Sequence, residues 1–157
     1  MAKKTSTGAV GWILRGAAAG AAGTTALNVV AYLDMALRGR PASSTPQRTV
    51  ERLAETAHVS IPGEGDQRTS RLEGLGALTG LIAGVGVGGL LGLARAAGFR
   101  AGTLLTTATV MVSTNGPMTV LGITDPRTWS RTDWVSDIVP HLAYAAVVTS
   151  TLDALDR

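Results

Sequence analysis

Five glycines recur at intervals of four residues, inside a segment from Gly74 to Ala94 that carries no charged side chain. In water, each glycine inside a helix costs about 1 kcal/mol relative to alanine, so five of them oppose helix formation. A membrane changes this balance, because a spanning segment must satisfy its backbone internally and the missing side chains let a neighbouring backbone approach closely. The pattern therefore predicts a membrane helix packed tightly against another helix. The five positions are Gly76, Gly80, Gly84, Gly88 and Gly92.

Long runs with little or no charge occur at four places, and about 20 apolar residues suffice to cross a bilayer core of about 30 Å. We expect one membrane domain over residues 1–157, with spans at about 12–35, 74–95, 101–123 and 134–153. The first run is long enough only when Trp12 to Leu14 extend it, and the fourth is polar at its start. The sequence thus predicts an all-α integral membrane bundle of about four transmembrane helices.

The N-terminal run has a second interpretation, as a cleaved signal peptide. Lys3 and Lys4 would form its charged start, and the small residues Ala17 to Ala19 would offer a cleavage site. However, Arg15 interrupts the apolar core that such a peptide needs, and the apolar run continues well beyond the small residues. We therefore expect this segment to remain in the protein as a helix.

A long polar connection separates the first two expected spans. Within it, Thr45 and Pro46 have the residue types of a helix N-cap and first helical position. The residues that follow place apolar side chains at i, i+3, i+4 and i+7, with charged side chains on the other faces. We expect a short amphipathic helix over about 46–58, which lies on the bilayer surface or covers one end of the bundle. Its apolar positions are Val50, Leu53, Ala54 and Ala57.

The net charge of +3 comes from basic residues scattered at the ends of the apolar runs. Beyond Lys3 and Lys4 there is no basic cluster, and no aromatic residues alternate with basic ones, which argues against a nucleic-acid partner. An even number of spans places both termini beside the basic hinge from Arg95 to Arg100, and most acidic residues fall on the long-loop side. We therefore expect both termini in the cytoplasm. The expected partners are the lipid bilayer and other membrane subunits, including a second copy of the chain.

Glycines at steps of four do not stay on one face, because each step drifts by about 40° on a helix of 3.6 residues per turn. We expect two neighbouring helices to share them. The first span carries small and polar residues at the same step, so we expect it to pair closely with the second span, with Asn28 hydrogen-bonded inside the bundle. In the alternative interpretation these polar groups line a water path. The residues at this step are Gly16, Gly20, Thr24, Asn28 and Tyr32.

Motifs of catalysis and cofactor binding are missing from the sequence. Gly84 to Gly89 reads G-x-G-x-x-G, but it lies inside a helical apolar run, without the strand and the later acidic residue that dinucleotide binding requires. The chain has no cysteine and only two histidines, far apart in sequence, so no metal site can be assembled from it. We expect a protein that is not an enzyme and that carries no cofactor and no metal.

The third expected span is locally disrupted at Asn115 to Pro117. Pro117 removes a backbone donor and kinks a helix, while Gly116 adds backbone freedom. A broken helix at membrane depth can expose backbone groups to a substrate or an ion. An ordinary proline kink explains the same residues without any such role.

Asp133, Asp137 and His141 recur at four-residue steps along the start of the fourth span, roughly on one face. A carboxylate and an imidazole one turn apart can share a proton near neutral pH, as in a proton relay. In the other interpretation the aspartates occupy a helix N-terminus, where the macrodipole favours anions, and Trp129 and Trp134 mark the membrane interface. The candidate relay or transport residues are Asp137, His141, Asn115 and Asn28.

The stretch from Gly122 to Tyr144 combines a Gly-Ile-Thr-Asp-Pro turn, a tryptophan at Trp134, the pair Asp137-Ile138 and the pair His141-Leu142. In these features it resembles the closing stretch of the YagU-like family of bacterial inner-membrane proteins. The resemblance covers only this C-terminal part of the chain. It implies a small integral protein of the bacterial inner membrane, loosely linked to acid tolerance, in which Asp137 and His141 are the positions carried over.

Two classes of function follow from these features. The first is a structural or accessory membrane protein, such as a subunit of a larger assembly, which explains the tight packing and the missing catalytic motifs. The second is a small transporter or proton-conducting, pH-responsive channel that uses Asp137, His141 and the disruption at Asn115 to Pro117. A relay requires these groups to face one continuous polar cavity, whereas a packing role leaves each of them individually satisfied.

Overall fold

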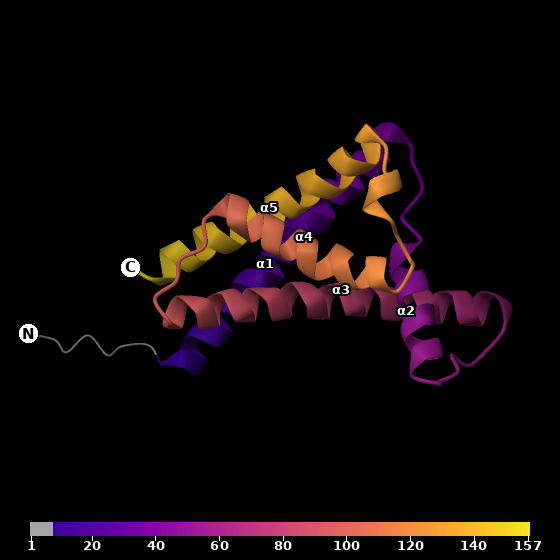
Figure 1. Cartoon of the computed structure of the whole chain (residues 1–157), viewed down its shortest axis with the longest axis horizontal. Coiled ribbons are helices and arrows are strands. Elements are labelled where there is room, and N and C mark those ends of the chain that lie inside the picture. Colours follow the sequence, from indigo (N-terminus) through magenta and orange to yellow (C-terminus); the bar gives the residue numbers. More distant parts are fainter. Residues whose placement is uncertain (1–7) are drawn as a thin grey trace, which may run out of the picture.

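The computed structural model describes residues 8–157, which form five α-helices and one turn of 3-10 helix, with no β-strand in this range (Figure 1). The expected all-α class is confirmed. Lys3 and Lys4, the basic pair that would begin a signal peptide, lie outside the described residues. The elements are α1 (Ala9–Arg38), α2 (Thr45–Thr56), α3 (Gly65–Ala96), α4 (Thr103–Val120), η1 (Pro126–Thr128) and α5 (Arg131–Leu155).

Helix α1 makes the main contacts that hold the bundle together. It packs against α3 and against α5, while α4 packs on α5 and α2 packs on α3. In Figure 1, α3 runs along the long axis of the molecule, and α1 and α5 lie together at an angle to it. The short helix α2 crosses α3 toward its N-terminal end (Figure 1). Because α1 and α3 cross, only a limited stretch of each helix can be in close contact.

The buried and exposed faces of α3 and α1 are the reverse of those of helices in water-soluble proteins, where large apolar side chains are buried. In α3, Gly84, Gly88 and Gly92 are buried, whereas Ile82 and Leu90 are 71% and 67% exposed. The same holds for α1, which apart from Trp12 buries small residues and exposes many large ones. Its buried residues are Trp12, Gly16, Ala19, Gly20, Gly23 and Thr24, and its exposed ones include Val10, Leu14, Val29, Leu33 and Leu37.

Most of the large side chains that are buried gather where α5 packs against the α1–α3 pair. Tyr144 of α5 is fully buried, and its hydroxyl donates to the carbonyl oxygen of Gly84 in α3 at 2.6 Å. Gly23 of α1 makes room for this side chain, since a Cβ at Gly23 would lie 2.9 Å from Tyr144 Cδ2. The core cluster consists of Trp12, Ala19, Val87, Val110, Tyr144, Val148 and Leu152.

Two helices, α3 and α5, are long and apolar enough to cross a membrane, judged by their length and composition. Both extend beyond the expected spans. α3 begins at Gly65, ahead of the expected start at residue 74, and α5 begins at Arg131. The added turns of α3 are polar and carry Asp66. The apolar run from Gly74 to Ala94 therefore marks the C-terminal part of a longer helix.

Helix α2 covers most of the expected amphipathic segment. The N-cap is Ser44 and not the expected Thr45, so Thr45 and Pro46 are the first two residues of the helix, and Val50 is buried. The helix ends because His58 takes a positive φ of 55°, which lets the Val59 amide donate back to the carbonyl oxygen of Ala54 at 2.9 Å. Since α2 contacts α3, it packs on the bundle.

Helices α4 and α5 each continue through an internal proline, Pro117 and Pro140. α4 therefore remains one helix through the disruption expected at Asn115 to Pro117. Hydroxyls before Pro117 bond to carbonyl oxygens of the same helix, with Ser113 donating to Thr109 at 2.7 Å. Such bonds satisfy side-chain hydroxyls within the helix and require no water.

Candidate functional site

Polar side chains from α4 and α5 meet in one partly buried cluster. The Asn115 amide donates from Nδ2 to Asp137 Oδ2 at 2.8 Å. His141 Nδ1 lies 2.7 Å from the backbone carbonyl oxygen of Asp137 and 3.5 Å from its Oδ1. Thr114 Oγ1 lies 3.4 Å from His141 Nε2. These four residues, which we call the α4–α5 polar cluster, join two helices through side chains.

The two ring nitrogens of His141 have different neighbours. A carbonyl oxygen only accepts, so Nδ1 carries a hydrogen and donates it to the Asp137 carbonyl oxygen. Thr114 has one hydroxyl hydrogen, which it donates to the Val110 carbonyl oxygen of its own helix at 2.9 Å. The contact between Thr114 Oγ1 and His141 Nε2, at 3.4 Å, is the longer of the two. The position of the ring is therefore set mainly by its bond to the Asp137 carbonyl oxygen.

The α4–α5 polar cluster is shielded from the surroundings, with the side chains of His141 and Asp137 12% and 21% exposed. Two cavities lie at the other end of α4 and α5, and no residue of the cluster lines either of them. Hydrogen bonds in such shielded places fix the geometry of their partners, because an unpaired polar group there is costly. The arrangement can hold α4 against α5.

Asp133 does not join the cluster but caps α5. Its Oδ2 accepts from the amide of Ser130 at 2.9 Å and from the hydroxyl of Ser130 at 2.7 Å. Ser130 Oγ in turn accepts from the Asp133 amide at 3.2 Å, which completes a capping box. Trp129 and Trp134 pack edge to face, with ring centroids 5.0 Å apart. Of the two aligned aspartates, Asp133 therefore stabilises the helix start, and Asp137 makes the contact with α4.

Asn28 lies apart from the cluster, partly buried on α1. Within residues 8–157 its side chain forms no hydrogen bond, whereas Thr24, one turn earlier, donates its hydroxyl to the Gly20 carbonyl oxygen at 2.8 Å. The hydrogen bond expected for Asn28 inside the bundle is therefore not formed with any described residue. The structure brings Asn115, Asp137 and His141 together and leaves Asn28 outside.

Helices α1 and α3 meet backbone to backbone at their glycines, which we call the α1–α3 glycine contact. A Cβ on Gly20 would lie 2.5 Å from the Gly84 carbonyl oxygen and 3.0 Å from Gly88 Cα. A Cβ on Gly88 would lie 2.5 Å from Gly20 Cα, and one on Gly92 would lie 3.0 Å from Gly16 Cα. Contacts this short force the helices apart, because the atoms in the way belong to the backbone and cannot rotate aside.

Two other glycines of the four-residue repeat in α3, Gly76 and Gly80, do not face α1. Gly76 faces α2, where a Cβ would lie 3.0 Å from Pro46 Cβ, and Gly80 has no atom within 4 Å of that position. Sequence reasoning missed Gly23, which lies on the face of α1 that contacts α5. A Cβ at Gly23 would lie 2.6 Å from Val148 Cγ2. Its position three residues after Gly20 is the signal that would reveal it, because residues three apart lie on neighbouring faces of a helix.

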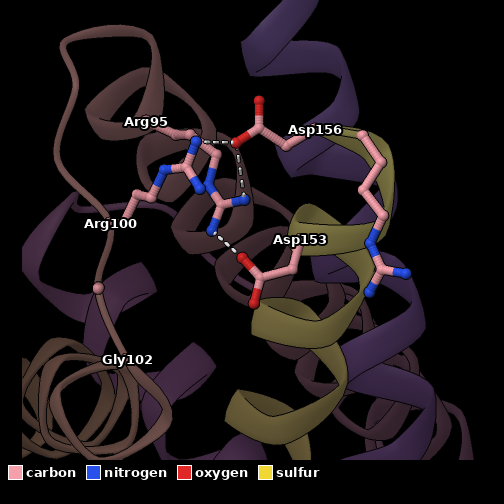
Figure 2. A pocket seen from close by; sticks show the side chains of 7 residues that line it. Arg95, Arg100, Gly102, Asp153 and Asp156 are labelled. Carbon is pink, nitrogen blue, oxygen red and sulfur yellow. Dashed lines mark hydrogen bonds and ion pairs between the residues drawn. The ribbon is translucent and has the colours of Figure 1, made fainter.

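A charged cluster at the C-terminal end of α3 also escapes sequence reasoning. The Arg95 side chain is only 5% exposed, and its Nη2 donates to Asp153 Oδ1 at 2.5 Å. Asp156 Oδ2 lies 3.7 Å from Arg95 Nη1 and 2.5 Å from Arg100 Nη2 (Figure 2). Arg95 and Asp153 are 58 positions apart in sequence, so only the packing of α3 and α5 reveals this pairing.

The loop between α4 and α5 is organised by its own residues. Asp125 Oδ1 accepts from the Arg127 amide at 3.0 Å and from its Nε at 2.9 Å, and Oδ2 accepts from Nη2 at 2.9 Å. These hydrogen bonds from Arg127 lower the pKa of the Asp125 carboxyl below its ordinary value. Trp129 Nε1 donates to Thr124 Oγ1 at 2.9 Å. Residues of the Gly-Ile-Thr-Asp-Pro turn therefore hold the loop in a fixed shape.

No family model, curated protein or solved structure matches the chain. The resemblance of its C-terminal stretch to the YagU-like family therefore stays a prediction. Any function has to follow from the residues and contacts of this chain.

Proposed function

We propose that this protein is a small integral membrane protein with a structural or accessory role, in which α1, α3, α4 and α5 cross the bilayer. One observation carries the proposal: α1 and α3 bury glycines where they meet, such as Gly20 and Gly88, and turn many large apolar side chains outward. In water, burial of apolar surface contributes about 25 cal/mol per Å² to folding, and this packing forgoes much of that contribution. Lipid tails around the bundle remove the disadvantage.

Close contact through small residues is also what helix association in lipid requires. Lipid tails are as apolar as leucine, so association depends on van der Waals contact between helices and on internal hydrogen bonds. Gly20 and Gly88 allow that contact between α1 and α3. Thr24 and Thr107 donate their hydroxyls to carbonyl oxygens of their own helices, at 2.8 and 2.9 Å, so they need no water in the bilayer. The role that these features support is packing.

The proposed location is the bacterial inner membrane, with both termini in the cytoplasm. Arginines near the N-terminal end of α1 and the C-terminal end of α3 lie beside the C-terminal end of α5. Arg15 donates to the Leu155 carbonyl oxygen at 2.9 Å, and Arg95 pairs with Asp153. Basic residues that flank spans at one end of a bundle favour the cytoplasmic side. The same features suit a subunit that adds its outward apolar faces to a larger membrane assembly.

Fractionation tests the membrane assignment. Membranes from cells that express the full chain are washed with alkaline carbonate, and the protein should remain in the pellet, because integral helices resist this treatment. Release of the intact chain into the soluble fraction contradicts the proposal. The chain has no cysteine, so single-cysteine variants report topology without a background. Ala97→Cys should be shielded from an impermeant thiol reagent outside the cell, and Ser60→Cys should react.

The α4–α5 polar cluster supports a second candidate, a small proton-conducting or pH-responsive channel or transporter. Asn115, Asp137 and His141 form a partly buried hydrogen-bonded unit that contains a carboxylate and an imidazole one helical turn apart. One observation argues against a continuous relay. The apolar side chain of Val110 is only 2% exposed, and it lies along α4 between Thr114 and the threonines near the start of the helix, so it interrupts the row of polar groups. The structural role is therefore the better supported of the two.

Proton flux into liposomes tests the second candidate. The purified chain is reconstituted, and acidification of the lumen is followed after a pH jump. A relay predicts flux that His141→Gln abolishes and Asp137→Asn changes in its pH dependence, with the helical content of both variants preserved. Flux no greater than that of empty liposomes, or equal flux from both variants and the wild type, leaves the structural role alone.

A further inference from the structure

An open cavity of about 470 Å³ lies where the C-terminal end of α3, the start of α4 and the C-terminal end of α5 meet (Figure 2). Three guanidinium groups and two side-chain carboxylates line it, so the side chains carry one positive charge in excess. Its volume is within the range of about 300–1,000 Å³ typical of small-ligand sites. The residues around it are Arg95, Arg100, Ala101, Gly102, Asp153, Asp156 and Arg157.

Arg95 forms a fixed wall of this cavity. Its side chain is 5% exposed, lies 5.9 Å from the centre of the Trp12 ring, and is held by the hydrogen bond from Nη2 to Asp153. Nη1 is buried and has no hydrogen-bond partner among the residues that the structure describes, since Asp156 is 3.7 Å away. A buried cationic donor without a partner is costly, and an anionic oxygen would satisfy it.

Arg100 and Arg157 are the movable cations of the site. Arg100 comes from the α3–α4 connection, has a side chain that is 67% exposed, and pairs with Asp156. Arg157 follows α5 and forms no ion pair within residues 8–157. Exposed ion pairs contribute little to stability, so Arg100 can turn from Asp156 toward an anion without a large loss of folding free energy, and Arg157 has no ion pair to lose within residues 8–157.

The start of α4 adds backbone donors. Gly102 is the N-cap and has no side chain to bond the first turn, and the first intrahelical bond runs from the Thr106 amide to the Gly102 carbonyl oxygen at 2.9 Å. The amides of Thr103 to Leu105 therefore have no partner within the helix. Together with the positive end of the helix dipole they favour an anion beside Gly102.

We propose that this cavity binds a phosphate group. Guanidinium groups recognise phosphate through paired N–H···O bonds, and free amides at a helix start recognise the same oxygens. The phosphate has two possible sources, an acidic lipid headgroup or a soluble phosphate. The lipid source rests on the proposed membrane function, which puts this end of the bundle at headgroup level, whereas the soluble source does not need it.

Native mass spectrometry of the full chain in neutral detergent tests the proposal. The probes are phosphatidic acid and diacylglycerol, which share the same acyl chains and differ in the phosphate, and inorganic phosphate is measured separately by calorimetry. We expect phosphatidic acid, and not diacylglycerol, to stay bound. Arg100→Gln and Arg157→Gln should each weaken binding about tenfold, since each removes a charge-assisted hydrogen bond.

Two further variants separate binding from folding. Asp153→Asn removes a repelling carboxylate while Asp156 remains beside Arg95, so it should strengthen phosphate binding about threefold to tenfold. A merely structural role for Asp153 predicts no such gain. Arg131→Gln makes the same charge change as Arg100→Gln on an exposed residue at the opposite end of α5, and it should leave binding unchanged.

The outcomes are distinct. Binding of phosphatidic acid without inorganic phosphate identifies a lipid headgroup as the ligand, and comparable binding of inorganic phosphate identifies a soluble ligand. Binding of neither probe, or undiminished binding by the Arg100→Gln/Arg157→Gln double variant, overturns the proposal. Retention in carbonate-washed membranes together with no phosphate binding contradicts only this site. Release by carbonate together with phosphate binding contradicts only the membrane function.

Discussion

The α1–α3 glycine contact and the contact between α4 and α5 hold helices together in opposite ways. Between α1 and α3 the closest contacts are backbone to backbone, with Gly20 facing Gly84 and Gly88. Between α4 and α5, side chains make the contact, as in the bond from Asn115 to Asp137 at 2.8 Å. The first contact depends on the absence of atoms and the second on the presence of polar ones. One should therefore fail when an atom is added, and the other when a polar group is removed.

The largest effect is expected at the α1–α3 glycine contact. Gly88→Ala adds one carbon 2.5 Å from Gly20 Cα, so the two backbones must separate. We expect a loss of about 2–3 kcal/mol in the free energy of unfolding, in the range typical of overpacked cores. Thermal unfolding in detergent, followed by circular dichroism, measures it.

Gly80→Ala is the matched control, because it makes the same change in the same helix at a position with no atom within 4 Å. It should leave stability unchanged or raise it by up to about 1 kcal/mol, since alanine favours a helix more than glycine does. Equal losses in the two variants would falsify the view that Gly88 acts through close approach of the backbones.

A smaller effect is expected at the α4–α5 polar cluster. Asn115→Ala leaves Asp137 Oδ2 without its donor in a partly buried place. The expected loss is about 1–2 kcal/mol, because hydrogen bonds between membrane helices contribute less than their strength in isolation. Asn28→Ala is the control, since the Asn28 side chain forms no hydrogen bond within residues 8–157, and it should unfold at nearly the wild-type temperature.

The two contacts also differ in how far the sequence foretells them. A charge-free run with repeated glycines is a local pattern, so it indicates a helix and a face that a neighbour can approach. The bond between Asn115 and Asp137 joins residues 22 positions apart on different helices, and no spacing within either helix specifies it. Sequence reasoning paired Asp137 with His141 because they share a helix face, and it had no means of finding the partner on α4.

Helix ends were the other point that the sequence left open. The polar first turns of α3 lack the apolar periodicity that marks a helix, so the start at Gly65 could not be seen in the charge-free run. Asp133 could be an anion at a helix start or a member of a relay, and only the coordinates show its reciprocal bonds with Ser130. The membrane spans themselves remain predictions, with α3 and α5 the helices whose length and composition suffice.

A third prediction concerns Tyr144, whose hydrogen bond joins α5, a member of one contact, to α3, a member of the other. Tyr144→Phe removes the hydroxyl that donates from α5 to the Gly84 carbonyl oxygen at 2.6 Å and leaves the ring in place. Because a carbonyl oxygen in a helix already accepts one backbone bond, only its second bond is lost, and we expect a cost of about 1 kcal/mol or less. Chemical unfolding in detergent measures it. A loss as large as that of Gly88→Ala contradicts the ranking of the contacts.

The smallest effect is expected in the loop that joins α4 to α5, outside both contacts. Arg127 lowers the pKa of Asp125 in the folded state, so the unfolded chain takes up this proton more readily. The stabilisation is therefore fully present above the unfolded pKa of about 3.9, and it disappears as the pH falls through the lower folded value. Asp125→Asn lacks this contribution, so its melting temperature should lie slightly below that of the wild type at neutral pH and converge with it in acid.

Arg127→Gln should show the same pH dependence, because it removes the other partner of the same pair. A difference that persists undiminished in acid means that Asp125 acts through the uncharged geometry of its turn and not through its ion pair.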